Sequence, residues 1–374
     1  MTAARFTTIY RVRSEPGSIA ARAEAIAVEQ SVEMPLSAID SPDVLADIVG
    51  RVEDVADRGD GSFDVRIGLA TATTGQDAGQ FLNMVFGNTS LHADMVLRDV
   101  EIPAELAAAF GGPRHGIAEL RRRVGAVDRA FTCSALKPQG LPAERLAELA
   151  GRFARGGIDF IKDDHGLADQ AYSPFAERVA ACAASIRKAV DITGHATRYV
   201  PSLSGDLDQM RRQIDIARGA SIDTVIIAPM IAGWSNMQAL LRHSPDIAFF
   251  AHPTMGGAAR IAPELLIGKL FRLLGADAVI FPNHGGRFGY TPETCRCLAN
   301  QARVPWHGIR PSVPVPAGGM NLQRVPEMLD FYGPDAMLLI GGSLLEAREL
   351  LTEQTAAFTK AVAQHGYRTG SQPA

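Results

Sequence analysis

Apolar and polar positions alternate along the first third of the chain in short segments that predict a small α+β domain. Residues 6–13 alternate and are rich in Thr, Ile, Tyr and Val, which is typical of a strand. A helix, two strands around the turn Arg58-Gly59-Asp60-Gly61, a second helix and a last strand are expected over residues 17–30, 45–55, 62–71, 77–86 and 95–102. This β-α-β-β-α-β order predicts a ferredoxin-like domain over residues 1–120.

From residue 129 onwards, short apolar strands alternate with amphipathic helices eight times. The expected strands are residues 130–137, 158–162, 196–200, 224–228, 247–252, 278–282, 313–316 and 336–340. The expected helices are residues 142–155, 174–192, 206–217, 236–243, 262–274, 292–301, 323–332 and 344–365. Eight β-α units in about 245 residues predict a (β/α)8 TIM barrel over residues 121–374. A doubly wound open sheet is the alternative, but no G-x-G-x-x-G follows a first strand.

Composition and charge exclude several classes of protein. Apolar residues make up 47% and charged residues 21% of the chain, which is ordinary for a globular protein. No apolar run approaches the ~18 residues of a membrane span, and no secretory signal pattern is present, so we expect a cytoplasmic protein without a membrane partner. A net charge of −4 argues against nucleic-acid binding. Without a Walker motif, no nucleotide cofactor is expected.

Two of the few lysines lie at the strand ends where barrel enzymes have their active sites. Only five of the 37 basic residues are lysine, and Lys137 and Lys162 end the first and second barrel strands. A general preference for arginine explains the rarity, and a surface cation or an ion pair is the simpler role for each lysine. However, lysine can lose its proton and act as a base, which arginine cannot do. Active sites of barrels lie at these strand ends.

The second strand ends in the sequence Lys162-Asp163-Asp164-His165. Alternation predicts that Lys162 and Asp164 point into the barrel mouth and that Asp163 points towards the helices. Carboxylates beside a lysine indicate a site for a hard divalent cation such as Mg²⁺. Because an ammonium group cannot bind a metal, Lys162 must be deprotonated, carbamylated or placed elsewhere.

Other strand ends add candidate residues for binding and catalysis. His252 ends the fifth strand, where a histidine is as often structural as catalytic. The glycine-rich loop of residues 283–289 follows the sixth strand and can move over a ligand. Paired glycines after the last two strands can bind a phosphate through backbone N–H groups; they are Gly318, Gly319, Gly341 and Gly342.

These motifs resemble those of the RuBisCO large-subunit superfamily, and in particular the RuBisCO-like (form IV) proteins, which keep the fold but do not fix CO₂. The matching segments are Asn88, residues 136–138, the run Gly-Gly-Ile-Asp-Phe-Ile-Lys-Asp-Asp at 156–164, residues 316–320 and residues 341–342. The resemblance implies that Lys162 is carbamylated and binds Mg²⁺ together with Asp164, and that Lys137 is the acid/base group. It also implies a homodimer in which Glu29 and Asn88 reach the partner's active site.

The chain departs from RuBisCO at positions that matter for carboxylation. His165 replaces the glutamate that is the third metal ligand, which favours Mn²⁺ relative to Mg²⁺. Arg287 is the only cation in the loop that carries a lysine in RuBisCO. Pro253 replaces an arginine that anchors one phosphate of a bisphosphate. We therefore expect no carboxylation of ribulose bisphosphate.

The expected function is the metal-dependent enolisation of a phosphorylated ketose or keto-sugar acid, followed by decarboxylation or C–C cleavage. Two alternatives stay open: an enolase or isomerase step in methylthioribose salvage, and a metal-free relative without catalytic activity. The candidate catalytic residues are Lys137 and His252, and the candidate metal ligands are Lys162, Asp164 and His165.

Overall fold

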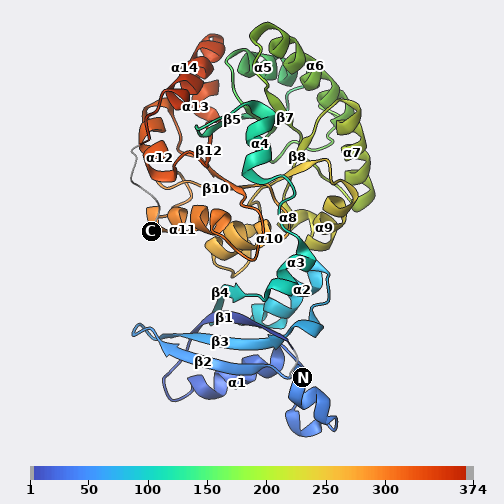
Figure 1. Ribbon diagram of the computed structural model, residues 1–374, viewed down its shortest axis with the longest axis vertical. Coiled ribbons are helices and arrows are strands. Elements are labelled where there is room, and N and C mark those ends of the chain that lie inside the picture. Colours follow the sequence, from blue (N-terminus) through green and yellow to red (C-terminus); the bar gives the residue numbers. More distant parts are fainter. Residues whose placement is uncertain (1–3, 368–374) are drawn as a thin grey trace.

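The computed structural model describes residues 4–367, which form two domains (Figure 1). The elements of the N-terminal domain follow in the expected order: β1 Arg5–Arg13, α1 Ile19–Glu29, β2 Arg51–Asp57, β3 Ser62–Ala70, α2 Ala78–Phe86 and β4 Met95–Glu101. The four strands form an antiparallel sheet in the order β2-β3-β1-β4. Every second residue of β1, from Phe6 to Val12, is buried against the helices, as the alternation predicts. The ferredoxin-like prediction is confirmed.

One predicted strand of this domain begins later than the sequence pattern suggests. Residues 45–48 are not part of a strand, because β2 begins at Arg51 and is preceded by a short π-helical turn over Val44–Ile48. None of its residues is buried, so its apolar side chains have no sheet face to cover. The guanidinium group of Arg5 donates hydrogen bonds to the carbonyl oxygens of Asp47 (3.1 Å) and Val49 (3.0 Å), which hold the turn in place.

The C-terminal domain is a closed barrel of eight parallel strands. The strands are β5 Phe131–Leu136, β6 Phe160–Asp163, β7 Arg198–Val200, β8 Thr224–Ile227, β9 Ala248–Ala251, β10 Ala278–Pro282, β11 Val313–Ala317 and β12 Met337–Leu339. They are hydrogen-bonded in the order β7-β6-β5-β12-β11-β10-β9-β8. The barrel closes between β7 and β8, the two ends of this order. The N–H of Ile226 in β8 donates to Pro201 O (3.0 Å), just after β7, and the N–H of Leu203 donates to Ile226 O (2.8 Å). The barrel prediction is therefore confirmed.

Helices surround the barrel, with two departures from the predicted pattern. The helices are α5 Ala143–Arg155, α6 Phe175–Thr193, α7 Leu207–Gly219, α8 Pro229–Ala232, α9 Trp234–His243, α10 Phe271–Leu273, α11 Pro292–Arg303, α12 Val325–Tyr332, α13 Gly342–Leu345 and α14 Leu351–Ala363. The helix expected over residues 262–274 is π-helical over Glu264–Leu270 and ends as α10. The helix expected over residues 344–365 is interrupted at Arg348, whose φ of 46° lies outside the helical region.

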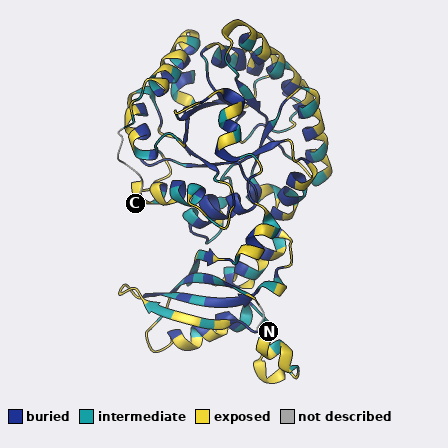
Figure 2. Ribbon diagram, viewed as in Figure 1, coloured by how far each residue is buried: buried dark blue, intermediate teal, exposed yellow. Residues whose placement is uncertain are grey.

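A helix between the domains closes the amino end of the barrel. α3 (Ala104–Phe110) ends the N-terminal domain, and α4 (Gly116–Val124) packs Ile117, Leu120 and Val124 onto the apolar residues inside the barrel. Arg123 of α4 donates to the carbonyl oxygen of Asp223 (2.7 Å), one residue before β8. Figure 1 shows α4 lying across the barrel, and Figure 2 shows the buried strands behind it. The carboxyl end is therefore the end at which a substrate can enter.

The two domains are joined by hydrogen bonds along the edge strand β4. The N–H of Leu97 donates to Arg260 O (2.9 Å), and its carbonyl accepts from the N–H of Ala262 (2.8 Å). Lys269 crosses the same contact and pairs with Asp99 (2.7 Å). Among residues 4–367, no helix combines the length and apolar character that a membrane crossing requires.

Candidate active site

The carboxyl ends of β5 and β6 bring two of the predicted residues into contact. Leu136 pairs with Asp163 in the sheet, so the next residues, Lys137 and Asp164, leave adjacent strands side by side. Lys137 Nζ lies 2.8 Å from Asp164 Oδ1, and 34% of the lysine side chain stays exposed to solvent. An amine and a carboxylate are thus presented together at the mouth of the barrel.

Lys162 is buried inside the barrel, and Asp163 faces the opposite way. The Lys162 amine donates to the backbone carbonyl of Asp163 (2.7 Å). Burial lowers the pKa of Lys162, although the charge of Asp164 opposes this shift. Asp163 accepts hydrogen bonds from Arg178 (3.1 Å), from the hydroxyl of Tyr199 (2.6 Å) and from the N–H of Ser202 (3.0 Å). Asp163 therefore holds β6 to its surroundings, and Lys162 faces the site.

Two histidine rings stack beside this pair. The rings of His165 and His252 lie 5.0 Å apart at an angle of 8°, and His165 Nδ1 is 3.5 Å from Asp164 Oδ1. Burial, followed by the positive charges of Lys162 and His165, lowers the pKa of His252 to about 2. His252 Nδ1 lies 2.5 Å from the hydroxyl oxygen of Thr254 and accepts a hydrogen bond from the N–H of the same residue (3.3 Å); with Nδ1 as the acceptor of both, the hydrogen of the neutral ring lies on Nε2. His252 is therefore a neutral hydrogen-bond donor.

The side chains present supply only part of a metal site. Within residues 4–367, no group of three His, Cys, Asp or Glu side chains could hold a metal ion. Asp164 and His165 offer two donors, and the third would have to be a carbamate on Lys162. The buried amine suits that modification, because CO₂ adds to a neutral amine and burial favours the neutral form of Lys162. The residues therefore fit Mg²⁺ once Lys162 is carbamylated.

The paired glycines lie at the same end of the barrel as Lys137. Gly318 and Gly342 are exposed, and a Cβ atom added at either would meet no atom within 4 Å. At Gly341 the added atom would lie 3.7 Å from Cε of Lys137, which places this glycine beside the amine. Gly319 packs against the loop after β10, where an added Cβ would lie 2.8 Å from Cα of Gly286.

Three predicted binding residues lie outside this cluster within one chain. Arg287 is exposed, and its guanidinium group lies over the ring of Phe288 (4.9 Å). Asn88 donates hydrogen bonds to Glu29 (3.0 Å) and Glu33 (2.9 Å), all three on the N-terminal domain. The structure therefore gathers Lys137, Lys162, Asp164, His165 and His252, and leaves Arg287, Glu29 and Asn88 apart from them.

Sequence reasoning missed two supporting residues. Thr254 orients the ring of His252 through its backbone N–H, and its position two residues after a strand-end histidine is the signal that could have identified it. Glu33 completes the cluster around Asn88; it lies in the acidic stretch after the first helix, which is by itself typical of a solvated loop.

The family follows from the fold, the site and comparison with known proteins. The model of the ribulose bisphosphate carboxylase large chain, catalytic domain, matches residues 116–349. The chain belongs to this family, as its motifs suggest. A crystal structure of a Rubisco-like protein from Rhodopseudomonas palustris superimposes with a TM-score of 0.92 at 51% identity, covering 98% of this chain and 100% of that one.

Two curated relatives narrow the class of protein further. The 5-methylthioribulose-1-phosphate isomerase of Rhodospirillum rubrum is 62% identical over 360 residues, which cover 96% of each chain. A 2,3-diketo-5-methylthiopentyl-1-phosphate enolase of Geobacillus thermodenitrificans is 30% identical, over 75% of this chain and 70% of that one. The chain is thus an enzyme of the RuBisCO-like group, whose relatives carry the names of isomerases and enolases rather than of carboxylases alone.

Proposed function

We propose that this enzyme isomerises 5-methylthioribulose 1-phosphate, or a close analogue, by moving a proton through an enediolate. The observation that carries the proposal is the Lys137 amine, which lies at the barrel mouth 2.8 Å from Asp164 and beside the backbone of Gly341. The extent of the identity to the isomerase of Rhodospirillum rubrum supports this substrate. The proposal adopts the salvage alternative over the decarboxylation or C–C cleavage that the sequence favours.

Lys137 and His252 can have separate roles in the reaction: Lys137 transfers the proton, and His252 stabilises the substrate oxygen. An isomerase removes a proton beside a carbonyl group and returns it to the neighbouring carbon. Lys137 can take up and return that proton, because its amine is partly exposed at the barrel mouth and lies 2.8 Å from the carboxylate of Asp164. His252 can donate a hydrogen bond from Nε2 to the substrate oxygen that becomes negative, and its low pKa keeps it neutral as it does so.

Mg²⁺ is the cofactor that we propose, with Mn²⁺ as the alternative. Asp164, His165 and a CO₂-derived carbamate on Lys162 would hold the ion. When bound, it supplies Lewis acidity that polarises the carbonyl group of the substrate. With His165, this donor set is one charge less negative than a set with a third carboxylate. We therefore expect weaker binding of Mg²⁺ and a relative gain in affinity for Mn²⁺.

A single phosphate group fits the glycine pairs of the barrel. Gly318, Gly319, Gly341 and Gly342 offer backbone N–H groups at the ends of neighbouring strands β11 and β12. Pro253 follows His252 and offers no cation for a second phosphate. Arg287, in the exposed loop after β10, is the cation that can close over the bound substrate.

We also infer that the enzyme works as a homodimer. Glu29, Glu33 and Asn88 form a polar cluster on the N-terminal domain, and their hydrogen bonds to one another do not involve the barrel of their own chain. In a homodimer, this cluster would lie at the active site in the barrel of the partner subunit.

The direct test is to incubate the purified enzyme with 5-methylthioribulose 1-phosphate and follow the carbon skeleton by NMR. We expect an isomer of equal mass with the phosphate ester intact. With ribulose 1,5-bisphosphate and labelled CO₂ we expect no labelled 3-phosphoglycerate. Carboxylation of that substrate would contradict the proposal, and so would turnover of the diketone of the enolase relatives without turnover of the ketose.

A further inference from the structure

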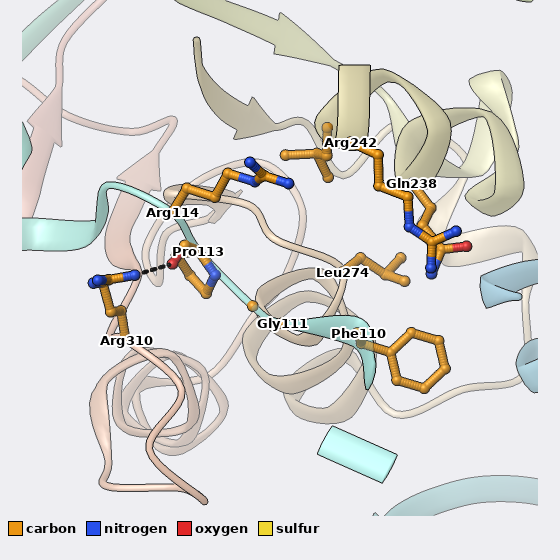
Figure 3. Close-up of a pocket in the computed structure, with 10 residues that line it drawn as sticks. Phe110, Gly111, Pro113, Arg114, Gln238, Arg242, Leu274 and Arg310 are labelled. Carbon is orange, nitrogen blue, oxygen red and sulfur yellow. Dashed lines mark hydrogen bonds between the residues drawn. The ribbon is translucent and has the colours of Figure 1, made fainter. Parts of the chain in front are cut away.

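We propose that a cavity at the junction of the two domains binds a small organic phosphate. The cavity has a volume of about 240 Å³ (Figure 3). Its lining comes from the link between α3 and α4 and from segments that precede β9, β10 and β11, namely Phe110, Gly111, Gly112, Pro113, Arg114, Gln238, Leu241, Arg242, Leu274 and Arg310. Since these segments enter the barrel at its amino end, the site is distinct from the cluster around Lys137. We call it the arginine cavity.

Three arginines surround the cavity without a carboxylate partner. Within residues 4–367, no acidic side chain lies within 4.0 Å of the guanidinium groups of Arg114, Arg242 or Arg310. Arg242 donates to Gln76 O (3.2 Å) and Arg310 to Pro113 O at 3.5 Å, which is the dashed line in Figure 3. All three arginines are exposed, so solvent screens their mutual repulsion, and their guanidinium groups can reach an anion at the mouth of the cavity.

Both carboxylate oxygens of Asp277, the acidic residue next to the link between α3 and α4, already accept hydrogen bonds from the backbone. Asp277 is buried, and its Oδ1 accepts hydrogen bonds from the N–H groups of His115 and Gly116, both at 2.8 Å. Its Oδ2 accepts from the N–H of Phe249 at 2.9 Å. Asp277 therefore anchors the start of α4 to the barrel and leaves the arginine cavity positively charged.

The apolar part of the lining specifies the rest of the ligand. Leu241 and Leu274 are buried, and Phe110 lies at the edge of the cavity. A guanidinium group forms paired hydrogen bonds with phosphate oxygens, whereas the leucine and phenylalanine side chains favour an apolar body. The volume lies below the roughly 300–1,000 Å³ of pockets for drug-sized ligands, which favours a small phosphate ester over a dinucleotide.

A ligand in this cavity would contact both domains. Phe110 ends the N-terminal domain, whereas Gln238 and Arg242 belong to α9 of the barrel. Gln238 already links the domains, because its amide accepts from the N–H of Ala78 (3.2 Å) and donates to Gln76 O (2.9 Å). A phosphate ester held by Arg114 and Arg242 would strengthen this link.

Chemical labelling of arginine tests the proposal one residue at a time. The full-length enzyme is treated with phenylglyoxal, with or without phenyl phosphate, and modified arginines are quantified by mass spectrometry. Arg212 is the internal control, because it is exposed on α7 and lies outside the cavity. At a concentration ten times its dissociation constant, phenyl phosphate should slow labelling of Arg114, Arg242 and Arg310 about tenfold. Labelling of Arg212 should not change.

Two results of this experiment would overturn the proposal. Equal labelling of Arg114, Arg310 and Arg212 with and without phenyl phosphate would show that the cavity binds no phosphate ester. Protection by inorganic phosphate at the same concentration, as strong as that by phenyl phosphate, would show that the apolar lining does not select an organic ligand.

A pair of variants provides an independent measurement. The double variant Arg114→Ala, Arg310→Ala should lose part of the rise in melting temperature that phenyl phosphate gives the wild type, and Arg212→Ala should keep all of it. An equal rise in both would contradict the proposal. The result does not depend on the proposed isomerase activity, since none of these arginines belongs to the cluster around Lys137.

Discussion

Lys162 and Lys269 are both buried, but their amines have different partners. Lys269 donates to the carboxylate of Asp99 (2.7 Å) and to Val100 O (2.6 Å), whereas the Lys162 amine donates to the backbone carbonyl of Asp163. A buried ammonium group without a carboxylate hydrogen bond is costly, and the pKa of Lys162 is accordingly lowered. This difference supports our proposal that Lys162 is carbamylated, whereas Lys269 is structural.

The first prediction about single residues concerns the metal requirement of the enzyme. Activity should disappear with EDTA and return with a divalent cation, and Mn²⁺ should restore it at a lower concentration than Mg²⁺. His165→Glu should lower the Mg²⁺ concentration for half-maximal activity, because a carboxylate is a harder ligand than imidazole. The measurement is rate against metal concentration.

His243→Glu is the matched control, since His243 is an exposed histidine at the end of α9 and the change adds the same charge. It should leave the metal dependence unchanged. An unchanged Mg²⁺ requirement in His165→Glu, or activity that no divalent ion affects, would remove His165 from the metal site.

At the scale of elements, β6 has two faces with separate tasks. Lys162 faces the site, whereas Asp163 forms a fully buried ion pair with Arg178. We predict that Asp163→Ala lowers the free energy of unfolding by about 3–5 kcal/mol, because it leaves the charge of Arg178 buried and unpaired. Asp208→Ala breaks an exposed pair with Arg211 and should cost less than about 1 kcal/mol. Urea denaturation of the two variants measures the difference, and similar values would contradict this account of β6.

The contact between the loops after β10 and β11 gives a third prediction. Gly318 and Gly319 both have positive φ angles, of 88° and 66°, so alanine is strained at either position. Only at Gly319 would the added Cβ also meet Gly286, at 2.8 Å from its Cα. Gly319→Ala should therefore displace the loop after β11, to which we assign phosphate binding, and lower kcat/KM by roughly 100-fold. Gly318→Ala should have a clearly smaller effect, and steady-state kinetics showing equal losses would contradict the packing argument.

The barrel could be predicted from the sequence because its strands are buried on both faces. All six residues of β5 are buried, and such short apolar runs between amphipathic helices are typical of parallel strands. The pattern failed over residues 45–48, where no residue is buried and the turn is stabilised by Arg5 from a distant position in the chain. A contact between residues so far apart in the chain leaves no pattern in the local sequence.

The site was predictable where it depends on strand order and unpredictable where it depends on loops. Lys137 and Asp164 meet because β5 and β6 are neighbours. The stacking of His165 on His252 joins β6 and β9, which are not adjacent in the sheet, and His165 lies beyond the end of its strand. Alternation along a strand gives no direction for such a residue.

At the scale of the whole molecule, the polar cluster of Glu29, Glu33 and Asn88 gives a prediction about assembly. We expect a homodimer in sedimentation experiments at micromolar concentration. Glu29→Gln should lower kcat without changing the melting temperature, whereas Glu24→Gln, exposed on the same helix, should change neither.

Mixing two variants of reduced activity tests the shared site more directly. Glu29→Gln alters the N-terminal domain and Lys137→Met alters the barrel, so a mixed dimer holds one intact site if the two domains come from different subunits. Activity should therefore return when the two variants are mixed and allowed to exchange subunits. A fully active monomer, or no recovery in dimers shown to have exchanged, would contradict the shared site.

The central claim is that Lys137 moves the proton of a phosphorylated ketose. The most direct measurement is incorporation of deuterium from D₂O into 5-methylthioribulose 1-phosphate beside its carbonyl group, followed by NMR. The wild type should exchange this position, and Lys137→Met should exchange it roughly 10²–10⁴-fold more slowly while it still binds the substrate. Lys360→Met, which removes an exposed lysine from α14, should exchange at the wild-type rate. Exchange by Lys137→Met at more than about a tenth of the wild-type rate would show that another group moves the proton.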